Sequence, residues 1–205
     1  MRTIKRWWFS LPVGTRSLLL GCHCLPIHGW FVAWAWWRLY GFPTDLRLWI
    51  AFFVHDIGYW NLTDMDGEEG EKHVERGAAL MHKWFDPIIR VGHGSKAYTI
   101  AGNTHWQDLC LYHSRFYAKK NGREPSRLCC ADKLALVLTP QWLWLILAHT
   151  SGEVHEYLNE VRDGKYSAQP IDGTDAKTMH RDMVEYLRAW VEQNKPEAQC
   201  QTQHA

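Results

Sequence analysis

The sequence predicts an all-α fold. Apolar residues recur every three to four positions along most of the chain, and almost no stretch alternates between apolar and polar residues. Glycine, proline or asparagine separates many of the periodic segments. Because 205 residues can bury a sizeable core within one domain, we expect a single domain over residues 1–194, with about eight to nine helices, and a flexible tail over 195–205.

The first long helix is expected over residues 28–40, with Gly41 as its stop. One stripe of this helix carries the tryptophans Trp30, Trp34 and Trp37. The next helix is expected over residues 45–56, with Thr44 as its N-cap. One face of it carries the apolar residues Leu46, Trp49, Ile50 and Phe53.

The same signals predict the remaining helices, which follow an acidic loop over residues 61–70. They are expected over residues 71–85, 96–106, 108–120, 126–138, 141–149, 152–162 and 175–193.

The composition excludes several classes of protein. A formal net charge of +1 does not produce the strong positive potential that attracts nucleic acid, so no nucleic-acid partner is expected. The six cysteines form neither a zinc-type CxxC pair nor a disulfide framework, which indicates the reducing cytoplasm.

No membrane span is expected. The uncharged stretches 17–37 and 134–152 are interrupted by glycine, proline or polar residues, so neither is a continuous apolar span of about 20 residues. The first residues resemble a signal sequence, but Arg16 lies where its apolar region should be. The thirteen tryptophans are interpreted as core residues. For the Trp-rich segment 141–147 a core helix is preferred, and contact with a second copy or a membrane surface is the alternative.

The stretch from Phe52 to Trp60 contains a His-Asp pair, His55-Asp56, at the end of an otherwise apolar helix. A buried carboxylate beside an imidazole is costly unless it is paired or bound to a metal. Imidazole nitrogen and carboxylate oxygen together suit iron, manganese, zinc or cobalt. The pair therefore predicts part of a metal site.

Further ligands are expected from other helices. His28 starts the helix before the one that carries the pair, and two antiparallel neighbours bring these ends together. Asp132 lies in a helix that is apolar nearly all round, where its carboxylate needs a cation. The alternative partner for Asp132 is Lys133 or Arg127.

His73 and His105 are candidates for a second ion. Each lies at the end of a predicted helix, and each alone is more often an ordinary surface or core histidine. Together they could bind a second metal, with Asp56 bridging the two ions through its two oxygens.

The order of these residues resembles the H…HD…H…H…D pattern of the HD-domain superfamily of metal-dependent phosphohydrolases. The local contexts are also similar: Trp49 to Gly58 resembles the apolar-HDIG block, His73 to Ala78 the H-P-x-x-G-A block, and Ala131-Asp132-Lys133 the terminal A-D block. The resemblance covers about residues 15–140 as the HD core and leaves 141–193 as C-terminal helices.

Three features depart from the family pattern. Tyr59 replaces the lysine of HDIGK, and Val74 stands in the proline position. The gap between His73 and His105 is longer than usual, so His93 is an alternative fifth ligand.

The resemblance implies hydrolysis of a phosphate ester or anhydride, on a nucleotide or a related small phosphorylated molecule, at a site for two divalent metal ions. It assigns His28, His55, Asp56 and Asp132 to the first ion, and Asp56, His73 and His105 to the second. The two cations would lower the pKa of the attacking water.

Residues after His105 are candidates for binding substrate phosphate: His113, Arg115, Lys119 and Arg127, with Lys120 beside them. A solvated basic surface is the plainer interpretation of the lysines and Arg127. In the acidic loop, Asp66 is a candidate general acid or supporting group, as is Asp64, and an acidic surface loop is the alternative.

Two other functions remain open. A branch of the same superfamily uses these ligands to hold an iron pair that activates oxygen, as in mixed-valence di-iron oxygenases. Other HD folds bind a nucleotide or a partner without catalysis, but the intact ligand set argues against that alternative. An oligomer that forms through the Trp-rich helices is a further alternative.

Overall fold

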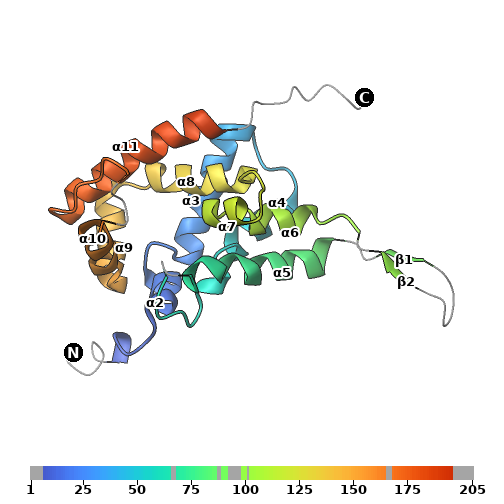
Figure 1. Cartoon of the computed structure of the whole chain (residues 1–205), viewed down its shortest axis with the longest axis horizontal. Coiled ribbons are helices and arrows are strands. Elements are labelled where there is room, and N and C mark those ends of the chain that lie inside the picture. Colours follow the sequence, from blue (N-terminus) through green and yellow to red (C-terminus); the bar gives the residue numbers. More distant parts are fainter. Residues whose placement is uncertain are drawn as a thin grey trace.

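The computed structural model describes residues 7–65, 68–86, 89–91, 98–100, 102–164 and 168–195, and helices dominate it (Figure 1). The described part contains ten α-helices, so the all-α prediction is confirmed with one helix more than expected. They are α2 (Val13–Leu20), α3 (Leu25–Tyr40), α4 (Leu46–Val54), α5 (His73–Phe85), α6 (His105–Leu111), α7 (Arg115–Lys120), α8 (Arg127–Leu138), α9 (Gln141–Ser151), α10 (Glu153–Arg162) and α11 (Ala176–Asn194). Two short 3₁₀ helices, η1 (Ile57–Tyr59) and η2 (Gly70–Lys72), precede α5.

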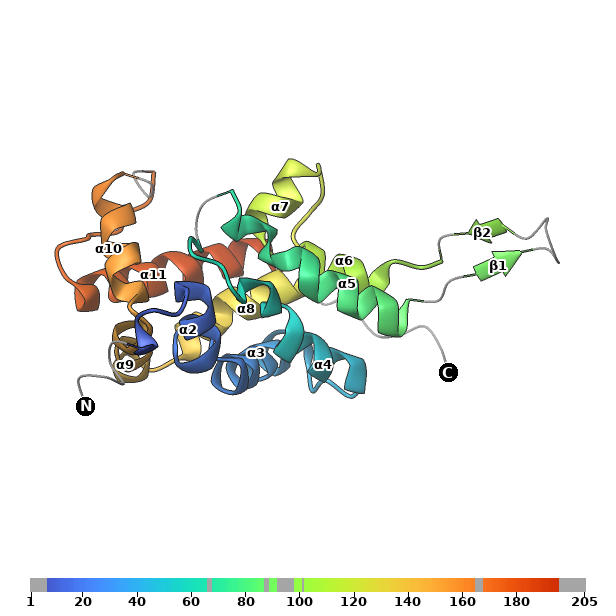
Figure 2. The ribbon, with the colours of Figure 1, turned by 90° about the horizontal axis from the view of Figure 1, so that it is seen from below.

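A small β-hairpin corrects the helix that was predicted over residues 96–106. Strands β1 (Ile89–Val91) and β2 (Tyr98–Ile100) pair antiparallel, with Ile89 opposite Ile100. Figures 1 and 2 both show the hairpin extending away from the helices. Its β-branched and aromatic residues favour extended backbone.

The start of α6 is fixed by Asp86, whose two carboxylate oxygens accept hydrogen bonds from the backbone N–H groups of Trp106 and Gln107 at 3.0 and 2.9 Å. The predicted helix over 108–120 is in fact two helices. The helix is interrupted at residues 112–114. The Ser114 side chain accepts a hydrogen bond from the Tyr117 N–H and so caps α7. This break decides where His113 lies.

Other caps agree with the sequence or move by one residue. Ser126 caps α8 through the Cys129 N–H, at the predicted boundary. Asp45, not Thr44, caps α4 by accepting from the Arg47 N–H at 2.9 Å. An ionised carboxylate interacts more favourably than a hydroxyl with the helix N-terminus.

The main core lies between α3, α4, α5, α6 and α8. Figure 1 shows α5 and α6 side by side, and α3 packs against α8. Small residues on α3 and α8, including Ala35, Ala131 and Ala135, are fully buried and let these two helices approach closely. Phe52 of α4 and Met81 of α5 fill the space beside them.

Two glycines bring α5 against the turn that carries His55 and Asp56. A Cβ on Gly58 would lie 1.9 Å from the His73 carbonyl oxygen, and one on Gly77 would lie 2.6 Å from that of Val54. Only glycine fits such backbone approaches without movement, so these residues hold His73 close to the His-Asp pair.

The tryptophans correct the prediction of an aromatic core. Three are buried, namely Trp36, Trp106 and Trp144. Seven are exposed, namely Trp7, Trp30, Trp34, Trp37, Trp60, Trp84 and Trp142. The cause on α3 is its orientation, because its small residues and Trp36 face the core and the predicted tryptophan stripe therefore faces outward. On α9, Trp144 is buried while Trp142 and Ile146 are exposed.

No single helix within the described ranges is long and apolar enough to cross a bilayer. Two helix pairs pass that test of length and composition when taken together, but they are strongly bent: α2 with α3 by 65°, and α8 with α9 by 101°.

Candidate metal centre

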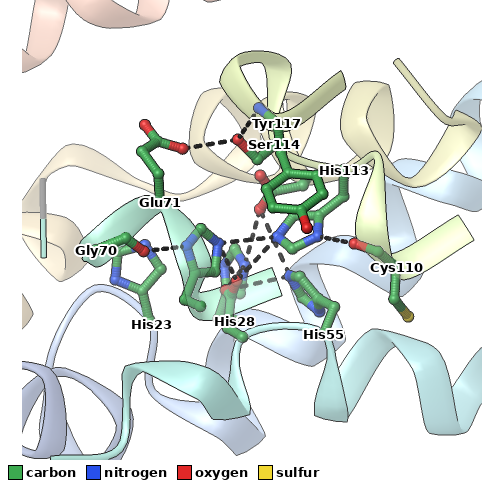
Figure 3. A network of polar contacts seen from close by, with 12 residues as sticks. His23, His28, His55, Gly70, Glu71, Cys110, His113, Ser114 and Tyr117 are labelled. Carbon is green, nitrogen blue, oxygen red and sulfur yellow. Dashed lines mark hydrogen bonds and ion pairs between the residues drawn. The ribbon is translucent and has the colours of Figure 1, made fainter. Parts of the chain in front are cut away.

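Six side chains from separate elements converge between α3, α5 and α8. His28 lies in the first turn of α3, His55 and Asp56 follow α4, His73 opens α5, His113 follows α6, and Asp132 lies in α8. Figure 3 shows His28, His55 and His113 directed toward one another from three parts of the chain. All except His28 are buried.

The first cluster contains His28, His55, Asp56 and Asp132, whose ligand atoms all lie within 4.8 Å of one another. His28 Nε2 lies 3.0 Å from Asp132 Oδ1 and 3.4 Å from Asp56 Oδ2. His55 Nε2 lies 3.1 Å from the same Asp56 oxygen. Atoms about 2.1 Å from one ion lie about 3 Å from each other, so this spacing matches a shared cation.

The second cluster contains Asp56, His73 and His113. The other oxygen of Asp56, Oδ1, lies 3.1 Å from His113 Nε2 and 3.6 Å from His73 Nε2. The two Nε2 atoms are 3.2 Å apart. The two oxygens of Asp56 thus face different clusters, which is the arrangement a bridging ligand needs.

Three of the histidines are oriented in the same way. His55, His73 and His113 each direct Nδ1 at the backbone carbonyl three residues earlier, at 3.1, 2.7 and 2.5 Å. A carbonyl only accepts, so each Nδ1 carries the hydrogen, and in the neutral ring the lone pair is on Nε2. Such a hydrogen bond is typical of metal-ligating histidines, because it fixes both the tautomer and the ring.

The buried atoms at the centre lack ordinary partners. His28 Nε2, His55 Nε2 and Asp56 Oδ2 are buried without a hydrogen bond of good geometry. In the second cluster, His73 Nε2 and His113 Nε2 lie 3.2 Å from each other beside Asp56 Oδ1. Buried polar atoms are rarely left unsatisfied, and a cation would satisfy all of these. The buried groups could therefore hold a metal ion.

The charges of the centre favour a cation. Burial by itself raises the pKa of Asp56, but His55, His113 and His28 outweigh it and hold this pKa well below its usual range. Burial by itself lowers the pKa of His55, yet Asp56 and Asp132 raise it to about 10. Two ionised carboxylates thus attract positive charge to the first cluster.

The second cluster is different, because burial, followed by the effect of His113, lowers the pKa of His73 to about 3. His73 is therefore neutral near pH 7, which is the state that binds a metal.

Lys133 supports the first cluster from outside. Its Nζ donates to Asp132 Oδ2 at 2.7 Å, which leaves Oδ1 to face His28. Burial raises the pKa of Asp132, but Lys133, His28 and His55 lower it well below the usual range. Asp132 therefore pairs with Lys133 through Oδ2 and faces His28 through Oδ1 at the same time.

A cavity of about 470 Å³ opens beside both clusters. Asp56, His73, His113 and Asp132 line its floor. Three cationic side chains lie around it, namely Arg115, Lys119 and Lys133. Arg115 donates to the Tyr186 hydroxyl at 3.1 Å and lies over the Trp190 ring, 5.1 Å from its centroid, so α11 holds this guanidinium in place.

The structure corrects two of the predicted site residues. His105 is exposed at the start of α6 and lines a different groove with Asp45 and Arg47, so His113 takes the position expected of His105. Arg127 is exposed in that same groove, 5.4 Å from the Tyr40 ring, away from the cavity.

The remaining predicted site residues lie at the cavity, on the exposed surface or outside the described residues. Arg115 and Lys119 line the cavity, while Lys120 is exposed and lies 3.8 Å from Glu68. Asp66 and His93 lie outside the described residues.

Two residues, His113 and Glu71, have roles that the sequence did not assign to them. His113 was expected to contact substrate, not to join the ligand cluster. Glu71 accepts a hydrogen bond from Ser114 at 2.7 Å and so ties the turn after His113 to the segment before His73 (Figure 3). The signal available for His113 was the N-cap residue Ser114, which indicates a helix break beside it.

A scan against protein-family models and searches of curated proteins and solved structures give no match for this chain.

Proposed function

We propose that this protein is a metal-dependent phosphohydrolase of the HD type that acts on a small phosphorylated molecule. The observation that carries the proposal is the pair of buried clusters that share Asp56, each built from nitrogen and oxygen donors. This donor set suits iron, manganese, zinc or cobalt. Divalent cations in such a pair act as Lewis acids, lower the pKa of water and neutralise phosphoryl charge.

The chain's own residues have separate tasks in this proposal. Asp56 would hold both ions through its two oxygens, and the hydrogen bonds at Nδ1 keep the Nε2 atoms of His55, His73 and His113 directed at the shared centre. Lys133 keeps Asp132 in place. The neutral state of His73 near pH 7 leaves its lone pair free for the cation.

The cavity supports a phosphate-bearing substrate. Its volume of about 470 Å³ fits a small organic phosphate. Arg115 and Lys119 at its wall supply the positive charge that a phosphate requires beyond the metals. The resemblance to HD phosphohydrolases in the order of His28, His55-Asp56, His73 and Asp132 points to the same reaction.

The test is elemental analysis of the purified full chain, followed by a phosphate-release assay with the metal that is found. The panel contains nucleoside mono-, di- and triphosphates, sugar phosphates and p-nitrophenyl phosphate. We expect about two metal equivalents per chain and release of inorganic phosphate that a chelator abolishes. Absence of bound metal would contradict the proposal. An iron pair with oxygen consumption and no phosphate release would favour the di-iron oxygenase instead.

A further inference from the structure

A third buried acidic group lies close to the metal centre but belongs to neither cluster. Glu153, the first residue of α10, is 1% exposed. Its Oε2 accepts hydrogen bonds from the Cys22 N–H at 2.9 Å and from the Ser151 hydroxyl at 2.5 Å. Its Oε1 accepts from Ser17 at 2.7 Å, from Tyr157 at 3.3 Å and from His23 at 3.2 Å. The two oxygens therefore contact different groups.

The Oε1 side fixes the orientation of His23. Its Nδ1 lies 3.2 Å from Glu153 Oε1 and 2.9 Å from Ser17 Oγ. The single hydroxyl hydrogen of Ser17 is used in the bond to Glu153, so Nδ1 of His23 must carry a hydrogen itself. The ring is thereby held with its opposite edge, which carries Nε2, turned away from the carboxylate.

The His23 side chain lines the cavity beside the metal centre. His23 lines both the 470 Å³ cavity and a crevice of about 80 Å³, and Asp132 lines both as well. Its ring centroid lies 4.8 Å from that of Tyr59 and 5.8 Å from that of His28, and Figure 3 places it beside His28. Its side chain is 21% exposed, and it belongs to neither ligand cluster.

We propose that His23 binds an oxygen of the substrate's phosphate group through Nε2, and that Glu153 is the positioning residue that holds His23 for this contact. The inference rests on the proposed phosphohydrolase function and adds a substrate-binding residue to it. Nε2 can accept a hydrogen bond from a phosphate hydroxyl or donate one to a phosphate oxygen, so the contact does not depend on one protonation state.

A purely structural role for Glu153 gives a different expectation. The Oε2 contacts with Cys22 and Ser151 tie α10 to the α2–α3 connection without involving His23. Ser151→Ala removes one donor on that side and leaves the His23 contact intact. It is therefore a matched control that weakens the same carboxylate network.

The experiment measures the affinity of inorganic phosphate for the metal-loaded full chain by isothermal titration calorimetry. We expect His23→Phe to weaken phosphate binding about tenfold or more, the loss of one charge-assisted hydrogen bond, with unchanged metal content. Glu153→Gln should weaken it less, because His23 is retained but less firmly held. Ser151→Ala should lower the thermal midpoint and keep the wild-type affinity.

Two results would overturn the inference: phosphate affinity of His23→Phe equal to wild type, or an equal loss of affinity in Ser151→Ala and His23→Phe. His23→Asn, measured in the same way, replaces the phenylalanine variant if that variant does not fold. A metal-loaded wild-type protein that hydrolyses none of the panel would instead overturn the proposed function. Release of phosphate by wild type together with equal phosphate binding by the variants would overturn only the role of His23.

Discussion

Replacing His113 with alanine should remove the second metal ion and leave the first. His113 Nε2 lies 3.1 Å from Asp56 Oδ1 and 3.2 Å from His73 Nε2, so it is central to the second cluster. His105, which the sequence favoured for this position, is exposed in another groove. His105→Ala is therefore the matched control, and it should retain both ions.

The size of the effect follows from the donors that remain. Without His113 the second cluster retains one oxygen of Asp56 and one nitrogen of His73, whereas metal sites in enzymes usually have at least three protein ligands. Loss of a group that merely supports a ligand already weakens metal binding about 10- to 100-fold. Loss of the ligand His113 itself should weaken metal binding by more than this factor. The metal content should therefore fall from about two ions per chain to about one.

The truncation also has a structural cost. His113 is 2% exposed, and its Nδ1 hydrogen bond to the Cys110 carbonyl is lost with the ring. We expect a loss of about 1–3 kcal/mol of folding free energy, which a stable domain tolerates.

The assay is elemental analysis after dialysis of wild type, His113→Ala and His105→Ala, with thermal melting by circular dichroism to show that each is folded. Two ions in folded His113→Ala, or the loss of an ion in His105→Ala, would refute the assignment of the second cluster.

Three further predictions address the same centre. Asp56→Asn should lose both ions and reduce phosphate release to background, because it removes the shared ligand; elemental analysis that finds even one tightly held ion would contradict this. In the chelator-treated protein, His73 should account for a loss of about 1 kcal/mol of stability between pH 6.5 and 5.5, because its folded pKa, about 3, lies below its unfolded value of 6.5, so that acid favours the unfolded chain; urea unfolding at these two pH values tests this, and His73→Gln should show a weaker dependence. Gly58→Ala should cost about 1–3 kcal/mol or more and reduce metal content, because its Cβ would meet the His73 backbone at 1.9 Å, whereas a wild-type melting temperature would show that no such contact exists.

The first cluster could be anticipated because its ligands lie at positions that simple rules locate. His55-Asp56 ends an apolar helix, and Asp132 lies in a helix with almost no other polar residue, so each signals a buried charge that needs a partner. The antiparallel relation of α3 and α4 then brings His28 to the same end. No long-range information beyond helix pairing was required.

The second cluster was located only in part, because it depends on where one helix breaks. A continuous helix over residues 108–120 would place His113 in its middle, whereas the break at 112–114 turns its ring toward Asp56. The N-cap residue Ser114 carried that information. The β-hairpin was missed for a related reason, since the extended preference of Tyr98-Thr99-Ile100 is visible only over three residues.

The exposed tryptophans show a limit of hydrophobicity as a guide to burial. The stripe Trp30, Trp34 and Trp37 is as periodic as a core-facing stripe, but the opposite face of α3 carries the small residues that pack against α8. Close helix packing therefore selected the face with alanine and valine. Periodicity identifies the two faces of a helix, and the partner decides which one is buried.

We propose that one carboxylate, Asp56, joins two metal ions. The most direct measurement is an anomalous difference map from crystals of the full chain soaked with Mn²⁺. We expect two peaks about 3.5–4 Å apart, one against His28, His55 and Asp132 and the other against His73 and His113, with Asp56 between them. A single peak, or peaks that leave Asp56 unligated, would contradict it.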